Sequence, residues 1–107
     1  MGNDFVIVKA KIRLRTAEEG GRSTPIKSGY RPNHFFEKEY NTEQLQILYV
    51  GDIQFDYELI HPGETKTVTV RFLPNDKVKQ FIKAGQKWFI CEGRHIIADG
   101  EVIAMQS

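Results

Sequence analysis

Three histidines and one cysteine are the residues of this 107-residue chain whose side chains most often bind metals or act as nucleophiles. His34, His61 and His95 lie far apart, and none belongs to a pair with metal-site spacing such as HxH or HExxH. With a single cysteine in the chain, the sequence predicts no zinc site. We therefore expect each histidine to lie on the surface or to be partly packed.

Cys91 would need a neighbouring base or cation to become a nucleophilic thiolate. Its neighbours on a predicted strand, Ile90 and Glu92, supply neither, so we expect Cys91 to be a small packed residue. No Gly-x-Ser-x-Gly motif and no GxxxxGK[ST] phosphate loop occurs in the sequence. The sequence thus predicts no enzyme, metal, cofactor or bound nucleotide, and an enzyme of unknown type is kept only as a remote alternative.

A glycine-rich segment, Gly20-Gly21-Arg22-Ser23-Thr24, has two interpretations. Its backbone N–H groups could form a nest that accepts an anion beside Arg22. Alternatively it is a tight corner between strands, with both glycines at positive φ and Arg22 paired with Glu18 or Glu19. The corner is favoured, because a barrel needs such corners whether or not it binds a ligand.

A basic row alternates with apolar residues over residues 5–15. Period-two alternation predicts a strand that is buried on one face only. The basic row could bind RNA phosphates, but a solvated outer face is favoured, because antiparallel sheets often have one polar side. The row consists of Lys9, Lys11, Arg13 and Arg15.

The remaining pattern predicts short strands separated by turns, which is typical of an all-β barrel or sandwich. Strands are expected at 34–36, 45–50, 53–60, 65–73, 87–92, 94–98 and 101–105, with a type II turn at 61–64. Gly51-Asp52, Gly93 and Asp99-Gly100 are interpreted as turns. One short helix is expected within 75–83, capped by Asn75 or Asp76.

Some apolar residues fall away from the predicted core or at its margin, namely Tyr40, Tyr49, Tyr57, Phe89 and Ile103. If these side chains form a contiguous patch, that patch would mark a protein interface.

The length of the chain predicts a single domain, 1–107. The net charge of +1 creates no field toward nucleic acid or membrane, and no window is apolar enough to span a bilayer, so a cytoplasmic protein is expected.

The residues from 18 to 36 carry a specific string. Glu-Glu-Gly-Gly-Arg-Ser-Thr-Pro-Ile is followed after a short gap by Gly-Tyr-Arg-Pro-Asn-His-Phe-Phe. This string resembles EEGGRHTPF and GYRPQFYF of the third, C-terminal domain of elongation factor Tu and its relatives. The segments 50–64 and 88–105 are similar to later strands of the same family, so the resemblance covers nearly the whole chain.

The resemblance implies a six-stranded antiparallel β-barrel without the family's GTPase domain. It also implies contacts to a transfer-RNA stem from positions matching Asn33, Val50, Leu73, Glu92 and Gly93. Val50 and Leu73 replace polar residues of the family, and their side chains cannot donate hydrogen bonds to RNA. The implied RNA surface is therefore only partly present.

Two functions follow as expectations. The first is a non-catalytic module that binds a protein, connected with translation, through the Gly20–Pro32 face. Its candidate residues are Gly20, Gly21, Arg22, Thr24, Tyr30, Arg31 and Asn33. The alternative is weak binding of transfer-RNA-like stems, with candidate residues Lys9, Lys11, Arg13, Arg15, Glu92 and Gly93.

Overall fold

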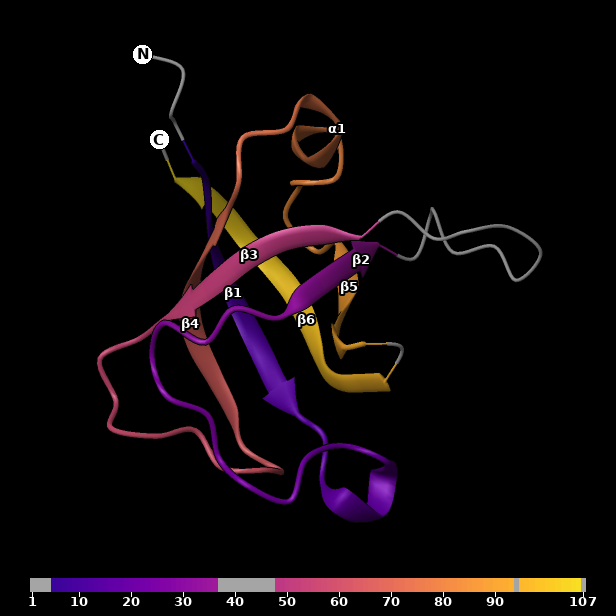
Figure 1. Ribbon diagram of the computed structural model, residues 1–107. Coiled ribbons are helices and arrows are strands. Elements are labelled where there is room, and N and C mark those ends of the chain that lie inside the picture. Colours follow the sequence, from indigo (N-terminus) through magenta and orange to yellow (C-terminus); the bar gives the residue numbers. More distant parts are fainter. Residues whose placement is uncertain (1–4, 37–47, 94, 107) are drawn as a thin grey trace, which may run out of the picture.

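The computed structural model describes residues 5–36, 48–93 and 95–106 and contains a closed antiparallel barrel (Figure 1). The strand order around the barrel is β1-β4-β3-β2-β5-β6, which confirms the all-β, six-stranded fold. The strands are β1 (Val6–Leu14), β2 (Asn33–Phe36), β3 (Tyr49–Gln54), β4 (Thr65–Phe72), β5 (Lys87–Glu92) and β6 (His95–Gln106).

Alternation along β1 places one side of the strand in the core, as the sequence predicts. Val8, Ala10, Ile12 and Leu14 are fully buried. β1 pairs with β4 on one side and with β6 on the other, so it lies between two neighbours along nearly all of its length. Its basic residues therefore point outward from the barrel wall.

Two predicted turns are wrong, and in both cases the glycine serves close packing instead of a turn. β3 continues through Gly51, and a Cβ there would lie 3.0 Å from the Phe72 ring. β6 continues through Gly100, where a Cβ would lie 2.8 Å from the Trp88 ring. Glycine within a strand permits such close approach of a neighbouring side chain. The chain consequently has fewer and longer strands, and residues 55–59 form no strand.

The connections follow the predicted turn chemistry more closely. Gly63 has φ +91°, and the N–H of Glu64 donates to the carbonyl of His61 at 3.0 Å, as in a type II turn. The short helix α1 (Asp76–Lys79) begins after Asn75, whose side chain accepts from the N–H of Lys77. Val78 of this helix is fully buried, so the connection between β4 and β5 contributes to the core.

A second short element, the 3-10 helix η1 (Ala17–Glu19), follows β1. The side chain of Thr16 accepts from the N–H of Glu19, and the Glu19 carboxylate accepts from the N–H of Thr16. Within the described part of the chain, no helix is long and apolar enough to cross a membrane.

Candidate interaction surface

Strand pairing brings together most of the positions that the family resemblance assigns to RNA contact. Asn33 on β2 lies opposite Val50 of β3 on one side and opposite Cys91 of β5 on the other. The N–H of Leu73, just after β4, donates to the carbonyl of Val50 at 3.0 Å. Residues that are far apart in the sequence therefore lie next to one another on or beside neighbouring strands.

A polar cluster joins the two candidate sites. The Arg22 guanidinium donates to the Glu92 carboxylate, and the Tyr30 hydroxyl donates to the same oxygen. Arg22 also donates to the Thr24 hydroxyl at 2.9 Å and to the Thr24 carbonyl at 3.2 Å. Residues predicted to bind protein (Arg22, Thr24, Tyr30) and one predicted to bind RNA (Glu92) thus form one network, which we call the Arg22 cluster.

Within the Arg22 cluster, the positive charge of Arg22 and the negative charge of Glu92 compensate each other. The Arg22 guanidinium lies 5.3 Å from the centroid of the Tyr30 ring, in addition to its ion pair. Burial raises the pKa of Tyr30, and the hydrogen bond to Glu92 raises it further. The phenol therefore stays protonated as a donor, and the Glu92 carboxylate is occupied by two donors from its own chain.

The corner around Gly20 differs from its prediction at Gly21. Gly20 has φ +92°, but Gly21 is not in the left-handed region. Gly21 is instead held close to β1, because its N–H donates to the carbonyl of Thr16 at 2.8 Å and a Cβ would lie 2.3 Å from the carbonyl oxygen of Arg15. The N–H of Gly20 is also used, by the carbonyl of Ala17, so these two amides do not form an anion nest.

The ion-pair partners also differ from the expected ones. Arg22 pairs with Glu92 and not with Glu18 or Glu19. Glu19 pairs instead with Arg13, whose guanidinium makes two contacts with it at 3.0 and 3.2 Å. Separation along the chain explains the error, because a partner 70 residues away cannot be recognised from local sequence.

Two of the four cations in the basic row of β1 are committed to ion pairs. Arg13 pairs with Glu19, and Arg15 makes a bidentate contact with Asp99 at 2.7 and 2.9 Å. Lys9 and Lys11 are exposed and form no ion pair with the described residues. This row therefore offers two free charges to an external phosphate, and not four.

Exposed apolar side chains form a surface on or beside β1, β3 and β4, next to the Arg22 cluster. Val6 pairs with Phe72, so Phe5 and Leu73 are the next residues beyond this pair on the two strands, and the N–H of Leu73 donates to the carbonyl of Val50. The Arg71 guanidinium lies over the Phe5 ring, 4.9 Å from the centroid of that ring. The exposed fractions of the members of this apolar surface are 40% for Phe5, 43% for Leu48, 37% for Val50 and 47% for Leu73.

The predicted apolar margin differs in composition from the apolar surface. Tyr49 is buried, because it points into the barrel next to Phe36. Phe89 is half-buried against Phe35, and Tyr40 lies outside the described residues. Tyr57 and Ile103 are exposed but lie in the loop after β3 and on β6. Phe5 and Leu48 were not singled out from the sequence, although both fall within predicted strands, 5–15 and 45–50; in the structure β1 begins at Val6 and β3 at Tyr49.

The reactive residues have structural roles. His34 is fully buried, contrary to expectation: its Nδ1 accepts from the Trp88 indole at 3.0 Å, and its Nε2 contacts the Gly51 carbonyl oxygen at 2.9 Å. Burial lowers the pKa of His34 to about 4, so the ring is neutral. His61 and His95 are exposed as predicted.

Cys91 is buried on β5, and burial raises the pKa of its thiol to about 11. This is the reverse of the shift that an activated nucleophile needs. Among the described residues, no three His, Cys, Asp or Glu side chains come together in a group that could hold a metal ion.

The positions of the other candidate residues complete this surface. Arg31 is exposed and Asn33 is half-buried next to the Arg22 cluster, and Gly93 is exposed at the end of β5 with φ +61°. The surface thus has an apolar part on the β1, β4 and β3 side and a polar part on the β2 and β5 side.

The residue string at 18–36 and the six-stranded barrel agree with a comparison of the chain with known protein families. A family model described as "Elongation factor Tu C-terminal domain" matches residues 4–106. This chain therefore belongs to the family of elongation factor Tu C-terminal domains, which are non-catalytic β-barrels.

Proposed function

We propose that this chain is a non-catalytic module that binds a protein of the translation apparatus through the apolar surface and the adjoining Arg22 cluster. The observation that supports this most directly is the pairing of Val50 with Leu73. Both side chains are exposed, their backbones are hydrogen-bonded, and both stand where the resemblance implies polar contacts to RNA. Replacing polar contacts with neighbouring apolar ones favours a protein partner over a phosphate backbone.

The layout of the surface also suits a protein. Protein interfaces combine a buried apolar centre with a polar rim, and arginine and tyrosine are enriched among their strongest contacts. Phe5 and Leu73 would occupy the centre, and Arg31 and Tyr30 would lie toward the rim. The charges of Arg22 and Glu92 compensate each other, so the rim needs no counter-charge from the partner.

The test is affinity capture from native lysate with Leu73→Asp and Val50→Asp variants, beside the wild type. We expect the protein captured by the wild type to be lost with either variant, because a buried, unpaired carboxylate at the interface centre is costly. Ile103→Asp is the matched control, since Ile103 has a similar exposed fraction of 40% but lies on β6. Circular dichroism of each variant establishes that the barrel is intact.

Treatment of the lysate with ribonuclease separates the two classes of partner. A protein held by apolar contacts stays bound after ribonuclease treatment and in high salt. Capture that ribonuclease and high salt both abolish would identify RNA as the ligand and contradict the proposal. Capture that is unchanged in Leu73→Asp and Val50→Asp would place the binding site elsewhere.

A further inference from the structure

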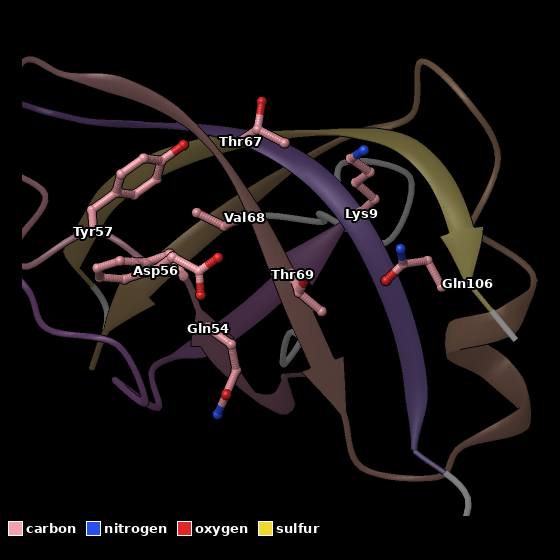
Figure 2. Close-up of a pocket in the computed structure, with 9 residues that line it drawn as sticks. Lys9, Gln54, Asp56, Tyr57, Thr67, Val68, Thr69 and Gln106 are labelled. Carbon is pink, nitrogen blue, oxygen red and sulfur yellow. The ribbon is translucent and has the colours of Figure 1, made fainter.

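A polar trough runs along the outer face of β4, apart from the interaction surface (Figure 2). Thr67 and Thr69 form its floor, with Lys9 and Gln106 to one side and Gln54, Asp56 and Tyr57 to the other. The register explains this shape: Thr69 lies between Lys9 of β1 and Gln54 of β3, and both neighbours have longer side chains. Short residues between long ones leave a hollow of about 440 Å³, within the range of ligand sites.

Most polar side chains of the trough have no side-chain partner among the described residues. Among the described residues, no side-chain hydrogen bond or ion pair involves Lys9, Thr67, Thr69 or Asp56. Gln54 donates its amide N–H to Asp52 at 2.8 Å, which leaves its carbonyl oxygen free to accept. The trough therefore offers both donors and acceptors to a ligand.

The charges of the trough point to a ligand without net charge. The lining has one ammonium group, on Lys9, and one carboxylate, on Asp56. An anion would meet the carboxylate of Asp56, and a cation would meet the ammonium of Lys9. A neutral ligand that both donates and accepts hydrogen bonds meets neither difficulty.

An aromatic ring completes the site. Tyr57 is exposed, makes a tilted contact with Phe55 at 6.0 Å, and has the Lys66 ammonium 5.0 Å from its ring centroid. The Tyr57 side chain thus presents an aromatic ring with an apolar face and a polar hydroxyl tip at the trough. Such a ring can pack against the C–H groups of a ligand whose hydroxyls bond to the threonines. We infer that the trough binds a neutral polyhydroxylated molecule, a sugar of one or two rings.

The test uses the full ¹⁵N-labelled chain and three neutral disaccharides as probes: maltose, cellobiose and lactose. We expect saturable shifts of the amide resonances of residues 54–57 and 67–69 with at least one of them. Affinity is expected to be unchanged between low and high salt, because no net charge is involved. The absence of any saturable shift with all three sugars would overturn the inference.

Substitutions distinguish the trough from other surfaces. Thr69→Val keeps the shape of the side chain but removes its hydroxyl, and we expect it to weaken sugar binding about fivefold, as for loss of one hydrogen bond. Tyr57→Ala should weaken binding at least as much. Thr65→Val is the control, because Thr65 shares strand and face but lies outside the trough.

Two results would contradict the inference even if binding is observed. If inorganic pyrophosphate binds in a salt-sensitive manner and Asp56→Asn strengthens its binding, the trough is an anion site. If Thr65→Val weakens sugar binding as much as Thr69→Val does, the ligand lies outside the trough.

Discussion

At the scale of single residues, burial decides the chemistry of the most reactive side chains. His34 and Cys91 are candidates for catalysis by residue type alone, yet both are enclosed by the barrel wall. Burial keeps the imidazole neutral and the thiol protonated, so neither has the charge state of an activated group. The sequence correctly predicted a packed role for Cys91. It did not predict the burial of His34, because a histidine between an asparagine and two phenylalanines has no local signature of its partner, Trp88.

The neutral, buried state of His34 makes stability depend on pH. The folded-state pKa of about 4 lies below the usual value of 6.5, so the unfolded chain takes up a proton first as the pH falls. Stability from this group is fully present above pH 6.5 and is lost as the pH falls toward 4. The full loss is about 3 kcal/mol. Urea unfolding of the wild type and His34→Phe at several pH values measures it.

The comparison with His34→Phe isolates this residue from other titrating groups. At pH 7 the variant should be less stable by about 1–3 kcal/mol, because the Trp88 indole loses its acceptor. The difference should shrink as the pH falls from 6.5 to 4, since only the wild type carries the titrating ring. A difference that stays constant over this range would contradict the assignment.

At the scale of strands and turns, glycine was the least reliable sequence signal. Gly63 and Gly20 have positive φ and mark turns, as predicted. Gly51 and Gly100 lie within strands and make room for the Phe72 and Trp88 rings. Local sequence cannot separate these two uses, because the ring that needs the space comes from another strand. Strand positions with clear alternation, such as those of β1 and β4, were predicted well because their pattern depends on burial of one face.

The corner after β1 tests the two uses of glycine side by side. Gly20 has positive φ but open space around the position of a Cβ, so Gly20→Ala should destabilise the barrel by about 1 kcal/mol, and Gly20→Asn by less. Gly21 is not at positive φ but has no space for a Cβ, so Gly21→Ala and Gly21→Asn should each cost about 2 kcal/mol or more. Thermal unfolding of the four variants gives the ranking. Equal effects of asparagine at the two positions would show that backbone conformation, and not space, limits Gly21.

At the scale of the whole molecule, barrel closure unites candidate residues that the sequence separates. The resemblance implied contacts to one RNA stem from positions that include Asn33, Val50 and Leu73, and strand pairing brings these three residues next to one another. What it could not indicate is how the charges are used. Arg13, Arg15 and Arg22 each have an acidic partner within the barrel, and these pairs depend on packing between distant segments. A chain with fifteen basic residues can therefore present few free cations on a given face.

This distribution of charge leads to a prediction for RNA. Lys9 and Lys11 are the exposed cations of the β1 row without an ion pair to the described residues, and the Glu92 carboxylate is occupied by Arg22 and Tyr30. Two phosphate contacts give a salt slope of only about two, against six to ten contacts in strong binders. We expect transfer RNA to bind no more tightly than about 10 µM at physiological salt. Fluorescence anisotropy with labelled transfer RNA measures this affinity.

Charge reversals show whether any residual binding uses this row. Lys11→Glu should reduce it, because it replaces a free cation with a carboxylate. Arg13→Glu should have a smaller effect on phosphate contacts, since Arg13 is already bonded to Glu19, although it also sets two carboxylates side by side. Sub-micromolar affinity that Lys11→Glu abolishes would contradict the prediction, because it would require the barrel to bind RNA tightly despite its internal ion pairs. The apolar character of Val50 and Leu73 would then need an explanation other than a protein partner.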